Sequence, residues 1–257
     1  GNISFYVASR GHHADVGGIT PGSMASDSCH LDEEGVLIPN LKIVDRTQFR
    51  IKEITDCLTG AKYPVRSLNQ NIEDLKAQLA SNEKGVTELL KAVDNFGKEV
   101  VFDYVRHVQD NAEESVRRIV AKLKSNQFKL KMDNGCHIQV SIEVNSSDRS
   151  AVVDFTGTSP QHSGNFNAPS AVCRAAVLYV FRTLVGEDIP MNEGCLRPIE
   201  IRVPSNCLLN PVYPAAVVAG NVETSQAIVD TLYGALGTVA EAQGTMNNLT
   251  FGNDRHQ

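Results

Sequence analysis

The hydrophobic periodicity of the chain changes near residue 125, and this change constrains the fold more than any other feature. Between residues 65 and 123, apolar side chains recur every three or four positions, which is the pattern of amphipathic helices. Gly85 and Gly97 interrupt this pattern. Between residues 137 and 144, apolar and polar residues alternate, so the apolar ones share one face of a strand. The sequence therefore predicts a helical block followed by a sheet.

Shorter patterns complete the expected elements. Strands are predicted at residues 3–8, 36–44, 151–155 and 199–203, and helices at residues 171–185 and 222–239. Pro39 places the second of these strands at an edge or a bulge. We expect an α+β (mixed α/β) fold of twisted mixed sheets with a helical insertion around residues 65–125. Residues 1–60 and 126–257 would form the mixed α/β core, and residues 61–125 a helical subdomain.

The charge balance and the length of the apolar runs exclude two classes of partner. The chain carries 30 acidic and 24 basic residues, a formal net charge of −6. Nucleic-acid binders need clustered Lys and Arg, so no nucleic-acid partner is expected. No apolar run approaches the roughly 18 to 20 residues that span a bilayer, so no membrane association is expected either.

The cysteines and the chain ends carry their own information. No two of the six cysteines form a CxxC pair, so neither a zinc knuckle nor a dense disulfide framework is expected. Buried or half-buried thiols and a cytoplasmic location fit this pattern. The chain starts at Gly1 and enters an extended pattern by Ile3, without a polar tail. We therefore expect a fragment of a longer polypeptide.

The strongest local motif is RGHHADVGG at residues 10–18. His12, His13 and Asp15 lie within four positions of one another, on a loop that leaves the first predicted strand. Imidazole and carboxylate groups are suitable ligands for Mn, Fe or Zn, and the flanking glycines allow the bend that would turn both histidines to one ion. The alternative is a surface loop with solvated histidines.

Two loops rich in small and amide residues, at 157–167 and 220–226, lie just before predicted helices. Unpaired N–H groups and the positive end of the macrodipole at a helix N-terminus favour carboxylate or phosphate ligands. The alternative is ordinary N-capping, by Asn167 or Ser170 in the first loop and by Asn221, Thr224 or Ser225 in the second. The sequence contains no phosphate-binding GxxxxGK[ST] loop, no GxGxxG motif and no GxSxG nucleophile elbow.

Taken together, these segments resemble the hydantoinase B family. That family includes the C-terminal part of ATP-dependent 5-oxoprolinases, N-methylhydantoinase subunits and an acetone carboxylase subunit. The matching segments are SRGHHADVGG at 9–18, PGSM at 21–24, DFTGTSPQ at 154–161, GNFNAP at 164–169, DIPMNEGC at 188–195, NP at 210–211, PAAVVAGNVETSQ at 214–226 and GTMNN at 244–248. The resemblance runs nearly from end to end, and residues 60–130 are its least distinctive part.

The resemblance implies a domain or subunit that acts with a hydantoinase A-type ATP-binding partner. That partner would use ATP to phosphorylate a lactam or another cyclic amide, and this part would complete the ring opening. The carboxylase branch carries a manganese site in the corresponding subunit. The family pattern also has a segment of the form N-D-P-Y-x-G-G-T-H-x-x-D upstream of the first strand, which this chain lacks. The metal site is therefore expected to be incomplete, and the fragment alone inactive.

The resemblance also implies roles for individual residues. By position, His12 is favoured as the ligand of a divalent transition metal (Mn, Fe or Zn). His13 is an alternative metal ligand, and Asp15 is either another ligand or a catalytic group that supports the ligands. Glu223 is expected as a proton shuttle or, equally, as a helix cap. The expected donors to a substrate carboxylate are Asn165, Asn167, Asn221, Thr224 and Ser225.

The leading hypothesis is therefore part of an ATP-dependent cyclic-amide hydrolase of the 5-oxoprolinase type, acting on 5-oxoproline or a hydantoin within a hetero-oligomer. One alternative is a subunit of an acetone-type ketone carboxylase, which would need bicarbonate. Another is a non-catalytic assembly domain, whose helices at 65–125 dock the ATP-binding partner.

Overall fold

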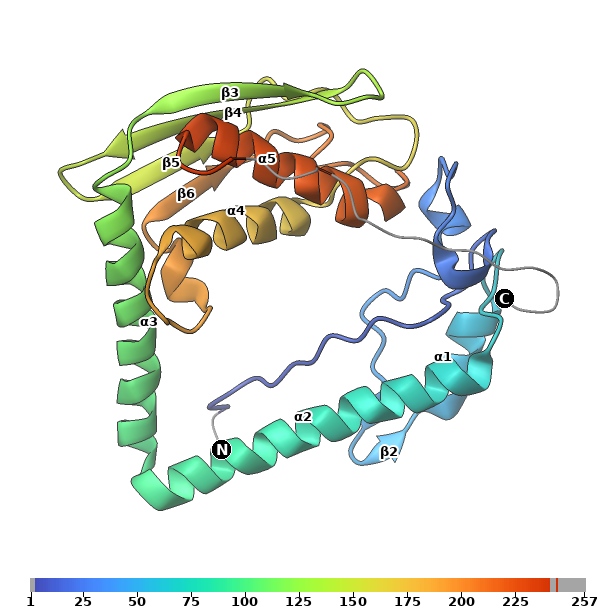
Figure 1. The fold of residues 1–257 in the computed structure, drawn as a ribbon. Coiled ribbons are helices and arrows are strands. Elements are labelled where there is room, and N and C mark those ends of the chain that lie inside the picture. The colour runs from blue at the N-terminus through green and yellow to red at the C-terminus, as the bar shows by residue number, and fades with distance from the viewer. Residues whose placement is uncertain (1–2, 241–243, 245–257) are drawn as a thin grey trace.

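The computed structural model describes residues 3–240 and Gly244, and it has the expected mixed α+β architecture (Figure 1). The helices are α1 (Ile51–Thr59), α2 (Leu68–Phe96), α3 (Lys98–Val120), α4 (Ser170–Leu184) and α5 (Ser225–Leu236). The strands are β1 (Val44–Asp45), β2 (Gln48–Phe49), β3 (Asn126–Lys131), β4 (His137–Asn145), β5 (Ser150–Asp154) and β6 (Ile199–Arg202). Single turns of 3-10 helix lie at Pro21–Ser23, Leu31–Glu33 and Glu193–Leu196, and a π-helical turn lies at Gly220–Thr224.

The main sheet has four strands in the order β3-β4-β5-β6. β4 pairs antiparallel with β3 and β5, whereas β6 pairs parallel with β5. The alternation expected from residue 137 onward is confirmed, since Ile138, Val140 and Ile142 are buried on one face of β4. β3 was not anticipated, because its residues follow the helical stripe as a short basic stretch.

Helices α4 and α5 pack against each other and cover one face of this sheet (Figure 1). α5 contacts β3 and β4, and the buried side chains of both helices join those of β4 and β5 in the main core. The C-terminal half of α3 contributes Ala112, Val116 and Val120 to the same core. The core therefore supports the N-terminal ends of α4 and α5, where the amide-rich loops lead in.

The helical block forms a long arm made of α2 and α3 (Figure 1). Gly97, with φ of +83°, separates the two helices, as its position in the sequence predicts. The break predicted at Gly85 is wrong, because α2 runs through it without interruption. A Cβ atom at Gly85 would lie 2.7 Å from Cγ1 of Val7, so this glycine allows another segment to approach rather than ending the helix.

The strand predicted at residues 3–8 is also wrong. This stretch has no sheet partner among the described residues and lies along the arm instead. Phe5 stacks on Phe102 with ring centroids 5.0 Å apart, and the Ser9 hydroxyl donates to the Gln78 carbonyl oxygen at 3.3 Å. The extended pattern at 36–44 forms a regular strand only at its end, where β1 pairs with β2. The alternating apolar residues at 3–8 therefore pack against helices. Their periodicity alone cannot distinguish this packing from pairing in a sheet.

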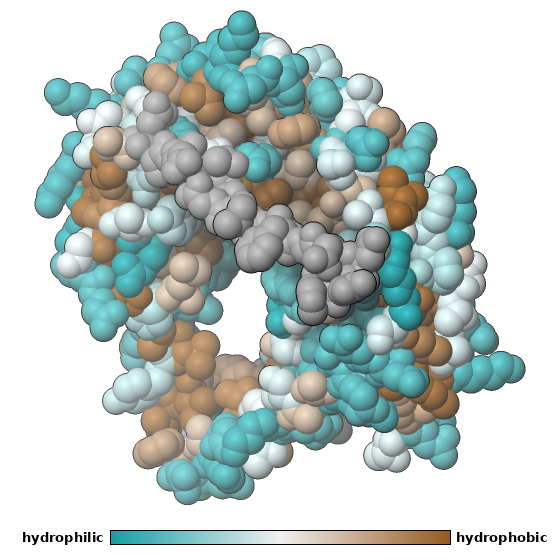
Figure 2. All heavy atoms as spheres, turned by 45° about the vertical axis from the view of Figure 1, so that its right-hand side comes forward, coloured by the Kyte–Doolittle hydropathy of each residue, from teal (hydrophilic) through white to brown (hydrophobic). Residues whose placement is uncertain are grey.

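A second, smaller core lies at the far end of the arm. It is built from Ile54 and Leu58 of α1 and Ile72 of α2. The buried apolar residues of the arm belong to one or the other of the two cores, and the division into domains at residues 60 and 125 stays a prediction. An apolar groove of about 710 Å³ lines the corner of α2 and α3, where Phe96 and Tyr104 are each 68% exposed. Figure 2 shows hydrophobic side chains gathered at the lower end of this arm.

The structure also bears on the expectations for the cysteines, for membrane spans and for the GTMNN segment. All six cysteines are free thiols, and five are buried or half-buried as expected, whereas Cys29 is exposed. In the part of the chain that the structure describes, no helix is both long and apolar enough to cross a bilayer. The GTMNN segment lies outside the described residues apart from Gly244.

Candidate functional site

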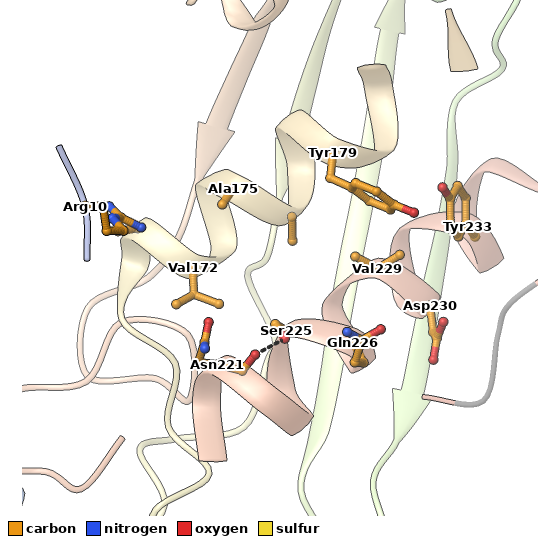
Figure 3. A pocket seen from close by; sticks show the side chains of 12 residues that line it. Arg10, Val172, Ala175, Tyr179, Asn221, Ser225, Gln226, Val229, Asp230 and Tyr233 are labelled. Carbon is orange, nitrogen blue, oxygen red and sulfur yellow. Dashed lines mark hydrogen bonds between the residues drawn. The ribbon is translucent and has the colours of Figure 1, made fainter. Parts of the chain in front are cut away.

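A pocket of about 540 Å³ lies between α4, α5 and the first residue of the histidine motif (Figure 3). α4 and α5 supply most of its walls, Asn221 comes from the π-helical turn before α5, and Arg10 comes from the distant N-terminal segment. Of the residues predicted to bind substrate, Asn221 and Ser225 line it. Tyr179 and Tyr233 line the other end of the pocket. Val172, Ala175 and Val229 form an apolar wall between the two ends.

The two predicted residues differ in what they can offer a ligand. The Ser225 hydroxyl donates to the Asn221 carbonyl oxygen at 2.6 Å, so its hydrogen is already used. Ser225 Oγ can therefore only accept a hydrogen bond from a ligand. The Asn221 side chain is exposed, makes no hydrogen bond to the described residues and points toward Val172 in Figure 3. Its amide nitrogen thus remains available as a donor.

The other three predicted donors are engaged within the protein. Asn167 is fully buried, and its amide nitrogen donates to the carbonyl oxygens of His162, Gly164 and Ala216 at 2.9–3.0 Å. Its side-chain oxygen accepts from the His162 N–H, so it caps no helix. Thr224 is fully buried as well, with its hydroxyl donated to a backbone carbonyl. These two residues hold the loops under the pocket.

Asn165, the third of these donors, belongs to a buried network around Glu34, a residue that sequence reasoning missed. The Asn165 amide donates to Ser28 Oγ at 3.3 Å, and the Ser28 hydroxyl donates to Glu34 Oε1 at 2.8 Å. The Glu34 carboxylate, 7% exposed, also accepts the N–H groups of Val217 and Val218 at 2.9 Å. This network fixes the strand-like loop that enters the π-helical turn carrying the pocket asparagine.

The histidine motif lies beside the first turns of α2. The Asn71 amide nitrogen donates to the Asp15 carbonyl oxygen at 2.8 Å and lies 3.1 Å from His13 Nδ1. The same Nδ1 atom lies 3.5 Å from Oδ2 of Asp74, so two side chains of α2 engage this ring nitrogen. His13 therefore offers a metal at most its Nε2 atom. His12 is exposed, and its ring makes no hydrogen bond to described residues.

Asp15 organises the loop of the motif. Its carboxylate accepts the N–H groups of Gly17 and Gly22 at 2.9 and 3.0 Å, and Arg66 donates to it from both backbone and guanidinium. Partial burial alone would raise the pKa of Asp15, but these hydrogen bonds together hold its pKa below the usual range. Both oxygens are therefore occupied and ionised, which gives Asp15 a structural position in this loop.

The remaining candidate, Glu223, lies outside the main pocket. It is half-buried and lines a second pocket of about 390 Å³ on another side of α5, together with Phe166 and Asp133. The two pockets share Asp230. Within residues 3–240 and Gly244, no three His, Cys, Asp or Glu side chains come together in a way that could hold a metal ion. The described residues alone therefore do not fit a metal centre.

Comparison with solved structures identifies the fold. The fold matches an ATP-dependent caprolactamase from Pseudomonas jessenii with a TM-score of 0.69 and 21% identity, covering 86% of this chain and 39% of that one. It also matches a nucleotide-free acetone carboxylase with a TM-score of 0.72 and 15% identity, covering 88% of this chain and 32% of that one. The chain thus has the fold of one part of these larger ATP-dependent enzymes.

The sequence itself shows the family. The profile of the hydantoinase B/oxoprolinase family matches residues 1–257, and the chain belongs to that family. It is 42% identical over 278 residues to 5-oxoprolinase 1 of Arabidopsis thaliana, which covers 99% of this chain and 22% of the relative. The chain spans about a fifth of the length of the curated relatives most similar to it.

Proposed function

We propose that this chain is the ring-opening part of an ATP-dependent cyclic-amide hydrolase of the 5-oxoprolinase type. The observation that carries the proposal is the similarity to a 5-oxoprolinase over 99% of the chain. The pocket between α4 and α5 supports it, since about 540 Å³ suits a small ring compound. A hydantoinase A-type ATP-binding subunit or domain is the proposed partner, and ATP is used there.

The chemistry assigns a limited task to this part. The partner transfers the γ-phosphoryl group of ATP to the oxygen of the ring amide and releases ADP, which makes the amide carbon electrophilic. One water adds to that carbon, the C–N bond breaks with a proton passing to the nitrogen, and a second water hydrolyses the resulting acyl phosphate to the carboxylate and phosphate. The overall change is lactam, ATP and two waters to amino acid, ADP and phosphate. In this scheme the apolar wall of the pocket holds the ring, and the donors at its edge orient it. His12 follows Arg10 by two residues, so their Cα atoms are at most about 7 Å apart, and the motif borders the pocket.

The test uses the full-length protein with its ATP-binding partner. We expect ADP and glutamate to be released together from 5-oxoproline and ATP. A panel of other lactams and a hydantoin defines the substrate range, and acetone with bicarbonate tests the ketone carboxylase alternative. If no lactam in the panel yields both ADP and a ring-opened product, the hydrolase proposal is wrong.

Metal dependence is a separate part of the proposal. His12 is the proposed ligand of a divalent metal (Mn, Fe or Zn), because His13 is engaged by Asn71. Metal analysis of the full-length protein should show bound metal that the His12→Ala variant loses, while His13→Ala loses less. A metal content that is unchanged in His12→Ala would contradict this role.

The second candidate role is assembly, and one observation favours it. The groove at the corner of α2 and α3 exposes Phe96, Val100 and Tyr104, a larger apolar surface than isolated exposed residues provide. In this role the arm contacts the ATP-binding partner. Tyr104→Glu should then reduce co-purification with that partner, whereas Lys84→Glu, on the same arm outside the groove, should not.

A further inference from the structure

The pocket between α4 and α5 is polarised along its length (Figure 3). Arg10 and Asn221 lie at one end, beside the first turn of α4. Tyr179, Tyr233 and Asp230 lie at the other end. Among the described residues that line the pocket, Arg10 is the only Lys or Arg, and it comes from a segment about 160 positions before α4. The fold therefore brings a cation of the N-terminal segment to one end of this cavity.

The guanidinium of Arg10 forms no ion pair with a carboxylate of the described residues. It is exposed and makes no ion pair or hydrogen bond with the described residues. Arg66, which serves the same motif, is by contrast paired with Asp15 and with the Gly18 carbonyl oxygen. A guanidinium presents five N–H donors in a fixed fork that matches two oxygens of a carboxylate or a phosphate. Arg10 thus offers the pocket an unused oxyanion-binding group.

Two further features at this end favour negative charge. The Asn221 amide is a free donor that points to the same side of the pocket. α4 begins after Pro169 without a side-chain cap, and Ala171 and Val172 of its first turn line the cavity. The positive end of the α4 macrodipole therefore adds to the field of Arg10.

The middle of the pocket carries no charged side chain. Ala175 and Val229 give it apolar surface, and the neutral amide of Gln226 lies beside them (Figure 3). A ligand that fits both regions has a small apolar ring and an oxyanion at one end. We propose that this pocket binds a small cyclic compound through an oxyanion held by Arg10 and Asn221, a proposal that rests on the hydrolase function proposed above. The oxyanion is either the carboxylate of the substrate or the phosphoryl group that activation places on the ring.

Equilibrium binding to the full-length protein tests this proposal without turnover. The probes are 5-oxoproline, its neutral analogue 2-pyrrolidone, and inorganic phosphate, each titrated by calorimetry in the absence of ATP. The variants are Arg10→Gln and Arg10→Lys. The matched control is Arg46→Gln, which removes the same charge from an exposed position outside every described pocket wall.

If the carboxylate is the oxyanion, wild type prefers 5-oxoproline to 2-pyrrolidone, and Arg10→Gln weakens 5-oxoproline binding by roughly ten- to a hundredfold, the usual loss for a hydrogen bond to a charged group. Binding of 2-pyrrolidone stays unchanged, and Arg10→Lys lies between. If the phosphoryl group is the oxyanion, the two lactams bind alike and Arg10→Gln instead weakens phosphate binding. The proposal is overturned if Arg10→Gln binds all three probes as Arg46→Gln and wild type do. A protein that binds these probes through Arg10 yet hydrolyses no lactam would contradict the proposed function alone.

Discussion

Replacement of Glu34 by alanine should loosen the loop that carries the pocket asparagine. The Glu34 carboxylate accepts the N–H groups of Val217 and Val218 and the hydroxyl of Ser28, all at 2.8–2.9 Å. Neither of the two valine N–H groups has another acceptor among the described residues. In the alanine variant the two N–H groups and the Ser28 hydroxyl lose the carboxylate that accepts all three hydrogen bonds. The Glu34 side chain is only 7% exposed, so water does not readily replace it.

The cost follows from the number of donors. A hydrogen bond to a charged group contributes about 1.5–3 kcal/mol, and an unsatisfied buried donor costs about 1–3 kcal/mol. Water entering the space left by the side chain recovers part of this, so we take about 1 kcal/mol for each of the three donors. The sum of about 3 kcal/mol corresponds to local opening on the order of a hundredfold more frequent, since 1.4 kcal/mol is a factor of ten.

Hydrogen exchange of the Val217 and Val218 amides in the full-length protein measures this opening directly. Exchange at these two positions should accelerate on the order of a hundredfold in Glu34→Ala. Glu34→Gln keeps an acceptor at the Oε1 position, which receives the Val218 N–H and one of the two bonds of the Val217 N–H. Its NH₂ group replaces Oε2, the second acceptor of the Val217 N–H at 2.9 Å. Its exchange should accelerate only about tenfold, for the loss of one hydrogen bond.

The control is Asp32→Ala, an exposed carboxylate in the same short turn as Glu34 with no bond to the loop. It should leave exchange at both valines unchanged. Equal exchange in Glu34→Ala and Asp32→Ala would refute the view that this buried carboxylate holds the loop.

Three further predictions concern other parts of the molecule. Gly85→Ala should detach the N-terminal segment from α2, because the added Cβ atom would lie 2.7 Å from Cγ1 of Val7. Proteolysis before residue 12 should become faster, even though alanine favours the helix itself by about 1 kcal/mol. The double variant with Val7→Ala should restore protection. Burial raises the pKa of Cys173 to about 12, so iodoacetamide at pH 8 should alkylate exposed Cys29 in the native protein and leave Cys173 unmodified; equal labelling would contradict the buried environment. The folded-state pKa of Asp15 is lowered, so its contribution to stability is present above the unfolded value near 3.9 and is lost as pH falls through the lowered pKa. Amide protection of its loop should therefore persist to about pH 4 and fall below it, and a loop equally protected in Asp15→Asn would argue against this anchor.

The sequence predicted those elements whose pattern depends on near neighbours. The stripe that became α3 and the alternation that became β4 both reflect burial against one face, and both lie where they were expected. Gly85 was misjudged because a glycine within a helix can either end it or admit another segment. Only the tertiary contact with Val7 decides between these outcomes.

The candidate site was predictable only where its signal comes from neighbours in the sequence. Amide residues before a helix indicated a polar site, and Asn221 does line the pocket. Asn167 has the same composition signal but is fully buried, because its partners lie on two backbone segments, the loop at 162–164 and Ala216. Glu34 lies in no motif, and Arg10 opens the histidine motif without a predicted role, since the neighbours of both residues in space come from the other half of the chain.

The contact between Glu34 and Val217 also has a consequence for the order of folding. It closes a loop across 183 residues. The chain entropy lost on closing such a loop is roughly 4–5 kcal/mol, which must be met by contacts already formed. During synthesis the segment that carries Glu34 emerges 183 residues before the loop that holds it. The pocket is therefore assembled late, after the sheet and its two helices, and a nascent chain has no oxyanion site until Arg10 and α5 have met.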